Sequence, residues 1–246
     1  MALQRTMASI AHHPASRRRP HKRRPHAGPL VAPVAVFAAV CVVAAVYVAY
    51  VLWPRWPDAP VATDAPSIPI TIGGTVFNIE PAAVRIPSQR HAGSQSRIDV
   101  AYLWPSLIPP DPSIKVIDGK PVDPNERLFA LIQLDDGALP LAERVRNIYP
   151  RYLSKSQAAG PEGLVVHPFR ADTPYEGEDL VYDQAQMERF LARCSRQGVA
   201  NAGTCLLEKR AGAADITFRF PREWLSDWRN VAAGIDKVMA RWRPNI

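Results

Sequence analysis

The sequence predicts an α+β protein in which an N-terminal transmembrane helix precedes a mostly antiparallel sheet domain with about three helices, including a long amphipathic C-terminal helix. Three observations support this prediction. A long uncharged apolar run lies near the start of the 246-residue chain, short runs of alternating apolar and polar residues follow it, and an apolar stripe with helical spacing ends the chain. Strands that are rarely separated by long helices favour antiparallel pairing with helices packed on one face.

Residues 1–29 are expected to form a disordered basic tail. They hold seven of the 30 basic residues and no acidic one, so the rest of the chain balances its 23 acidic residues. Prolines interrupt the tail and prevent a continuous helix. Basic residues beside a membrane segment attract anionic headgroups, so we expect the tail to contact anionic lipid at the cytoplasmic face and not nucleic acid. The clusters that would do so are Arg17, Arg18, Arg19, Lys22, Arg23 and Arg24.

Residues 30–53 form the predicted transmembrane helix. These 24 residues carry no charge. At about 1.5 Å per residue they extend about 36 Å, enough for a hydrocarbon core of about 30 Å. Seven basic residues precede the segment and only Arg55 closely follows it, which places the N-terminus in the cytoplasm and the main domain outside it. Four aromatic side chains at the far end suit the membrane interface, namely Tyr47, Tyr50, Trp53 and Trp56.

A cleaved signal peptide is the alternative interpretation of this N-terminal segment. Signal peptides also place basic residues before an apolar run, and cleavage after Ala62 would follow a small residue at the right side of the run. Their apolar region is usually about 7–15 residues long, however. The run here is longer and prolines surround most candidate cleavage positions, so the sequence favours an uncleaved anchor.

A proline-rich linker, residues 54–66, is expected to separate the span from a globular domain of residues 67–246. Gly73-Gly74 predicts a hairpin turn between the first two strands of that domain. The predicted strands are Ile68–Ile72, Thr75–Ile79, Ile98–Trp104, Leu128–Leu134, Leu164–Phe169, Asp179–Tyr182, Cys205–Lys209 and Ile216–Phe220.

Three segments of the domain have helical spacing. The first is short and carries Leu141, Val145 and Ile148. The second would begin at an Asp183 N-cap with Gln186 as its partner, and its apolar face would hold Met187, Phe190, Leu191 and Cys194. The third is the clearest, with an apolar stripe from Trp224 to Trp242 that the domain's own sheet should cover. The segment 105–126 has six prolines and is expected to be a surface loop outside the core.

The cysteines indicate an oxidising compartment for the main domain. Cys41 lies inside the predicted span, which leaves Cys194 and Cys205 in the domain. An isolated pair of this kind predicts a structural disulfide, and its spacing differs from the Cys-x-x-Cys of redox enzymes.

No local motif of catalysis or of cofactor or metal binding occurs in the sequence. It lacks HExxH, G-x-S-x-G, P-loop and Rossmann patterns. Only His91 and His167 follow the span, which is too few for a usual zinc site. The acidic group Glu176, Glu178, Asp179 and Asp183 is interpreted as a solvated loop before a strand, with cation binding as the alternative. We therefore predict no catalytic, cofactor-binding or metal-binding residues.

Several segments together carry a resemblance to known sequences. They are ITIGGTVFNIEP, RIDVAYLWPSL, YEGEDLVYD, FLARC, TCLLE and FRFPREWLSDW. In this order they resemble an uncharacterised family of single-pass, membrane-anchored bacterial envelope proteins without known activity, over residues 68–242. The resemblance implies a bacterial inner membrane, with the domain in the periplasm, and it implies no catalytic residue.

Together these observations predict a membrane-tethered periplasmic binding or accessory module with an envelope protein as partner. Two alternatives stay open at the level of sequence. One is an envelope hydrolase whose dispersed active site gathers His91, His167 and the acidic group. The other is an immunity or inhibitor protein with a rigid, disulfide-braced domain. A deep polar pocket would favour an enzyme, and an exposed apolar patch would favour a binding module.

Overall fold

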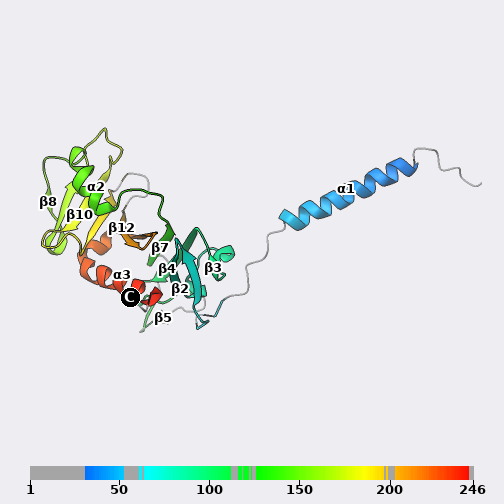
Figure 1. The fold of residues 1–246 in the computed structure, drawn as a ribbon, viewed down its shortest axis with the longest axis horizontal. Helices are drawn as coiled ribbons and strands as arrows, with labels where there is room; N and C mark the ends of the chain where they lie inside the picture. Colours follow the sequence, from blue (N-terminus) through cyan, green and yellow to red (C-terminus); the bar gives the residue numbers. More distant parts are fainter. Residues whose placement is uncertain are drawn as a thin grey trace, which may run out of the picture. The chain divides into compact units, whose positions relative to one another are not determined.

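The computed structural model describes residues 31–52, 61–62, 64–111, 116–117, 119–121, 123, 126–196, 198 and 203–243 (Figure 1). The chain divides into two compact units, residues 1–55 and residues 56–246. The tail clusters, Trp53, Trp56 and residues 54–60 and 63 of the predicted linker lie outside the described residues, so those predictions stay predictions.

The first unit contains a single described helix, α1 (Val31–Leu52), which has no charged residue. Residues Ala32–Val51 are long and apolar enough to cross a membrane, and none of this stretch is buried in the protein. Tyr47 and Tyr50 are exposed near its C-terminal end. Exposing so many apolar side chains to water is unfavourable, which agrees with a lipid environment for α1. Membrane crossing itself stays a prediction.

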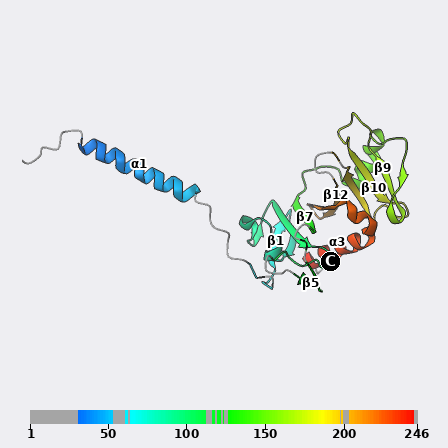
Figure 2. The same ribbon diagram turned by 180° about the vertical axis from the view of Figure 1, so that it is seen from behind.

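The second unit is built on an eight-stranded antiparallel sheet with the order β4-β7-β13-β12-β11-β10-β9-β8 (Figures 1 and 2). The six predicted strands that belong to this sheet are confirmed, with small shifts at their ends. The bounds are β4 (Arg97–Leu103), β7 (Arg127–Leu134), β8 (Ala158–Ala159), β9 (Leu164–Pro168), β10 (Glu178–Asp183), β11 (Leu191–Ser195), β12 (Thr204–Ala211) and β13 (Ala214–Pro221).

A smaller, three-stranded sheet is formed by the first strands of this unit. Its strands are β1 (Ile68–Ile72), β2 (Thr75–Ile79) and β3 (Gly93–Ser94), in the order β2-β1-β3, and β5 (Val116–Ile117) pairs with β6 (Lys120–Pro121) in a separate hairpin. Gly73 forms the β1–β2 turn with a φ of +57°, and a Cβ there would lie 2.7 Å from the carbonyl oxygen of Ala213. Glycine is therefore required at this position, where the β1–β2 turn touches the β12–β13 turn.

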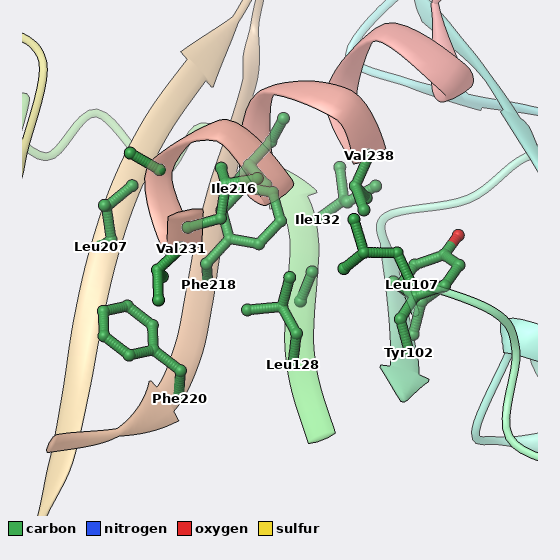
Figure 3. Close-up of a cluster of buried hydrophobic side chains, with 14 of the residues drawn as sticks. Tyr102, Leu107, Leu128, Ile132, Leu207, Ile216, Phe218, Phe220, Val231 and Val238 are labelled. Atoms are coloured by element: carbon green, nitrogen blue, oxygen red, sulfur yellow. The ribbon is translucent and has the colours of Figure 1, made fainter. Parts of the chain in front are cut away.

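Helix α3 (Trp228–Trp242) covers one face of the large sheet. Its stripe, which includes Val231, Ile235 and Val238, joins strand residues such as Phe218 in one buried core (Figure 3). Residues of β1 and β2 belong to the same core. The prediction that the domain's own sheet covers this stripe is confirmed. The first turn differs from the prediction, because Trp224 and Leu225 lie in a 3-10 segment, η5 (Arg222–Asp227), that precedes α3.

A second, smaller core lies on the opposite face of the sheet. It joins Leu141 of α2 (Leu141–Asn147) and Tyr149 of η3 (Tyr149–Arg151) to Phe169 and Leu180. The helices thus lie on both faces of the sheet, and the expectation that they share one face is wrong. The reason is that β10 has an apolar side chain to bury on each face, Val181 on one and Leu180 on the other, so each face needs a covering element. Three further 3-10 turns are η1 (Pro81–Ala83), η2 (Pro87–Gln89) and η4 (Pro161–Gly163).

The predicted second helix is wrong, because Leu191–Ser195 forms strand β11. The segment pairs on both sides, with β10 and with β12. The backbone hydrogen bonds of these two pairings stabilise a strand, although the apolar residues also have a short helical spacing. The side chain of Asp183 accepts a hydrogen bond from the Ala185 backbone N–H at 3.0 Å, so it closes a turn and caps no helix. The expected exclusion of the proline-rich segment from the core is also wrong at Leu107, which is buried beside α3.

Candidate binding surface

The outer face of the large sheet, opposite α3, is covered over only part of its width. Neighbouring residues of a strand point to opposite faces, and in β10 Val181 belongs to the α3 core while Leu180 belongs to the α2 core. Helix α2 and η3 therefore lie over β9, β10 and β11. Phe129, Leu131 and Leu206, which point outward from β7 and β12, belong to neither core and are half-buried.

We call the remaining outer surface the open face. Strand pairing aligns its residues in two rows across the sheet. One row holds Phe129, Arg219 and Leu206 and the other holds Leu131 and Thr217, while Ala101 and Asp99, which continue these rows into β4, are buried. Arg85 belongs to the same surface, because its backbone N–H donates to the Asp99 carbonyl at 2.9 Å beside the edge of β4.

Two guanidinium groups lie against one aromatic ring at the centre of the open face. The Cζ atom of Arg85 is 4.7 Å from the centroid of Phe129, and that of Arg219 is 4.9 Å from it. These distances are typical of cation–π contacts. Both arginine residues are exposed. Neither forms an ion pair within 4.0 Å among the residues that the structure describes.

The carboxylates around the open face are all held by other arginines. Arg97 donates two hydrogen bonds of 2.9 Å to Asp99, and these bonds lower the pKa of that carboxyl group, as Gln89 and the charge of Arg85 also do. Arg144 pairs with Glu208, and Arg210 binds Asp215 at 2.7 Å. Among the described residues, Arg85 and Arg219 therefore have no ion-pair partner within 4.0 Å, and the charge of Arg85 acts on Asp99, which Arg97 already binds.

A cavity of about 290 Å³ lies beside the open face. Pro140 and Leu141 of the α2 region, Met187 before β11 and the β12 residues from Leu207 to Arg210 line it. Ligand pockets commonly measure about 300–1,000 Å³. The cavity thus falls just below this range, and three of its charged lining residues, Glu208, Arg210 and Asp215, already have ion-pair partners.

The cysteines and histidines that the sequence analysis singled out lie in different parts of the outer unit. Cys194 and Cys205 form a disulfide between directly paired positions of β11 and β12, with Cα atoms 4.0 Å apart. His91 is exposed before β3, whereas His167 lies in β9 and its Nε2 is 2.8 Å from the Ser154 carbonyl oxygen. His91 therefore lies outside the strands, next to the small sheet, whereas His167 is part of the large sheet.

The acidic group around β10 does not converge on one point. Asp179 is buried and binds Arg222 at 2.5 Å, and Arg196 lies 3.4 Å from its other oxygen. Glu178 pairs with Arg193 at 2.9 Å. Glu178 and Asp179 thus form ion pairs with arginines that fix neighbouring segments of the chain.

A different set of carboxylates lies close together, at Asp135, Asp136 and Asp215, with ligand atoms within 4.8 Å of one another. Arg210 reaches both Asp135, at 3.1 Å, and Asp215, at 2.7 Å. A guanidinium thus already occupies the position between two of these carboxylates, which satisfies their charge without a metal ion.

Sequence reasoning missed the open face, although one signal for it was present. Strand β7 reads RLFALIQL, with Leu128, Ala130 and Ile132 on the α3 side and Phe129 and Leu131 on the other. A strand that is apolar on both faces is usually covered on both. In this chain no described helix covers the second face.

No protein-family model matches the chain, and no curated protein matches it, which is consistent with an uncharacterised family. Two solved structures are similar to it. Smlt3025, an immunity protein of the Stenotrophomonas maltophilia type IV secretion system, is 14% identical with a TM-score of 0.47, over 72% of this chain and 93% of that chain. The Neisseria meningitidis iron-regulated outer membrane lipoprotein FrpD is 13% identical with a TM-score of 0.44, over 76% of this chain and 96% of that chain.

Proposed function

We propose that this chain is a membrane-tethered binding module of the bacterial cell envelope, whose outer unit docks a protein partner in the periplasm. The open face carries this proposal. It combines half-buried Phe129, Leu131 and Leu206, which neither core uses, with the exposed cations Arg85 and Arg219. Aromatic residues and arginine are enriched at protein interfaces, and exposed apolar surface rimmed by polar groups marks such sites.

The tether follows from the N-terminal segment. Helix α1 is uncharged and has the length of a membrane span. The seven basic residues before it favour an N-terminus in the cytoplasm and an outer unit in the periplasm. A binding role is also supported by the ion pairs of the acidic residues. Asp179 and Glu178, for example, each bind an arginine.

The proposal is tested by placing a photoreactive amino acid at Leu131 in the full-length chain in cells. Irradiation should yield an adduct with an envelope protein. A matched probe at Ala233, exposed on α3 on the other side of the sheet, should yield little or none. If neither position, nor any other exposed position of the outer unit, gives an adduct, the binding function is contradicted. A toxin in the adduct would identify the module as an immunity or inhibitor protein.

A further inference from the structure

We infer that the open face binds an extended acidic segment of the partner, with two of its carboxylates held by Arg85 and Arg219 on either side of Phe129. This inference rests on the proposed binding function and names the chemistry of the ligand. It follows from the spacing of the two guanidinium groups, from the way that they are held, and from the charges around them.

The spacing matches that of alternate residues in an extended chain. Both Cζ atoms lie within 4.9 Å of one ring centroid, so they are at most about 10 Å apart. Residues i and i+2 of a strand point to the same side about 7 Å apart. Glutamate side chains at such positions reach both guanidinium groups, because each side chain extends a few ångströms from the backbone.

The contact with Phe129 leaves the N–H donors of both guanidinium groups available, because neither group hydrogen-bonds to another described residue. A guanidinium contacts an aromatic ring through its flat face, while its five N–H donors lie in its plane and bind carboxylates in bidentate fashion. The backbone of Arg85 is fixed by its bond to Asp99, and Arg219 belongs to β13, which pairs on both sides. The two groups are therefore partly ordered before a ligand arrives, which lowers the entropic cost of binding.

The surrounding charges favour an anionic ligand. Asp99 is bound to Arg97, Asp215 to Arg210 and Glu208 to Arg144. Each of these carboxylates is already neutralised, so the surface has surplus positive charge at Arg85 and Arg219. Such a surplus attracts and orients an anionic partner.

The apolar surroundings favour a peptide over a lipid headgroup or a free anion. Leu206 lies next to Arg219 in the same row of the sheet, and Leu131 follows two residues after Phe129 in β7. A peptide that carries apolar side chains on both sides of its two carboxylates contacts these leucines as well as the arginines. A headgroup phosphate would use the arginines alone.

The test uses the full-length chain in detergent, with its tail residues Arg17, Arg18, Arg19, Lys22, Arg23 and Arg24 replaced by Gln. Without this change the basic tail would itself attract an acidic peptide. The probe is fluorescently labelled Leu-Ser-Glu-Ser-Glu-Ser-Leu, and the control peptide has Gln in place of each Glu. Fluorescence anisotropy measures both affinities at several salt concentrations, and thermal unfolding verifies that each variant is folded.

We expect the Glu peptide to bind at one salt-sensitive site and the Gln peptide to bind far more weakly. Arg85→Gln and Arg219→Gln should each weaken binding about fivefold, as loss of an exposed ion pair worth about 1 kcal/mol would do. Replacing both arginines by Lys should restore part of the affinity, because charge returns without the bidentate geometry. The matched control is Arg189→Gln, since Arg189 is also exposed and lies 5.0 Å from an aromatic centroid, that of Trp228, on the other side of the sheet. It should bind as the parent does.

Two results would overturn the inference. One is equal binding of the Glu and Gln peptides, or an equal loss in the Arg189→Gln variant. The other is binding to phosphatidylglycerol vesicles that requires Arg85 and Arg219, without binding of the Glu peptide, which would identify a lipid ligand. The photoreactive probe at Leu131 separates these failures from failure of the proposed function. If the probe at Leu131 forms an adduct but the Glu peptide does not bind, the open face is a docking surface whose ligand is not an acidic segment.

Discussion

At the scale of single residues, a buried hydrogen-bonded group fastens the end of α3 to the sheet. The hydroxyl of Tyr102 donates to Glu80 at 2.7 Å and accepts from the indole N–H of Trp242 at 2.8 Å. Arg241 completes the group by binding the other oxygen of Glu80 at 3.1 Å. Each polar atom of the group thus has a partner, as buried polar atoms require.

Removing the Tyr102 hydroxyl should therefore destabilise the outer unit. Tyr102→Phe leaves the Trp242 indole N–H buried without an acceptor, and such losses cost about 1–3 kcal/mol. Urea unfolding followed by tryptophan fluorescence measures the change. Tyr182→Phe is the matched control, because its hydroxyl bonds Gln157 at an exposed site and should matter little. Equal effects of the two substitutions would show that the buried group does not fasten α3.

The same tyrosine predicts a loss of stability in alkali. Burial, with the negative charge of Glu80, raises the pKa of the Tyr102 hydroxyl well above its usual value. Above pH about 10 the unfolded chain releases this proton while the folded chain keeps it, so stability falls with rising pH. The slope for one such group approaches about 1.4 kcal/mol per pH unit. Unfolding of Tyr102→Phe should show a shallower decline between neutral and alkaline pH. Part of the decline should remain in this variant, because burial also raises the pKa of Tyr149.

At the scale of elements, close packing fixes how α3 lies against the segment after β4. A Cβ on Gly234 would lie 2.8 Å from Cζ3 of Trp104, whose ring stacks on Trp224 with centroids 4.8 Å apart. Gly234→Ala should therefore cost about 1–3 kcal/mol by overpacking. Helix propensity alone predicts a gain of up to about 1 kcal/mol. Ala233→Gly, on the exposed side of the same helix, should cost about 1 kcal/mol and calibrates the propensity effect. A more stable Gly234→Ala chain would contradict the tight contact.

The disulfide braces the pairing of β11 with β12. Cys194 and Cys205 are fully buried, so reductant should leave the folded protein unchanged and act only after unfolding. Replacing both by Ala should cost about 2–4 kcal/mol, the usual range for a structural disulfide. Thermal unfolding with and without reductant, for the parent and the double variant, measures both effects. Rapid reduction of the folded parent would contradict this burial.

Some of these elements could be predicted from the sequence, and others could not. The stripe from Val231 to Trp242 was predicted correctly because about three turns of regular apolar spacing identify a helix. Strand β11 was misread because Leu191 and Cys194 continue the helical spacing of Met187 and Phe190, and only the pairing partners of the strand exclude a helix. The open face could not be derived, because Phe129 and Arg219 meet only when β7 pairs with β13.

At the scale of the whole molecule, orientation in the membrane is the prediction on which the proposed function depends. Seven basic residues precede α1, and only Arg55 closely follows it. A reporter that is active only outside the cytoplasm should work when it is fused after Ile246 and fail when it is fused before Arg17. Retention of the full-length chain in membranes after an alkaline wash distinguishes an anchor from a cleaved signal. The opposite reporter pattern would place the open face in the cytoplasm and contradict a periplasmic role.

The contact between two hairpin turns, at Gly73 and Ala213, has a mechanical consequence. The chain that leaves the anchor enters the outer unit at β1, which pairs with β2 and β3 and not with the strands that form the open face. A force on the proposed membrane anchor would act first on β1, whose Ile70 and Ile72 pack in the α3 core. The contact between the two turns would oppose movement of the small sheet relative to the large sheet. The proposed partner would load β7 and β13 through Phe129 and Arg219, whereas its contact with Arg85 would load the segment between β2 and β3. In the proposed arrangement, the strand that follows the membrane anchor is thus distinct from β7 and β13, so that part of the binding surface does not carry the load of the anchor directly.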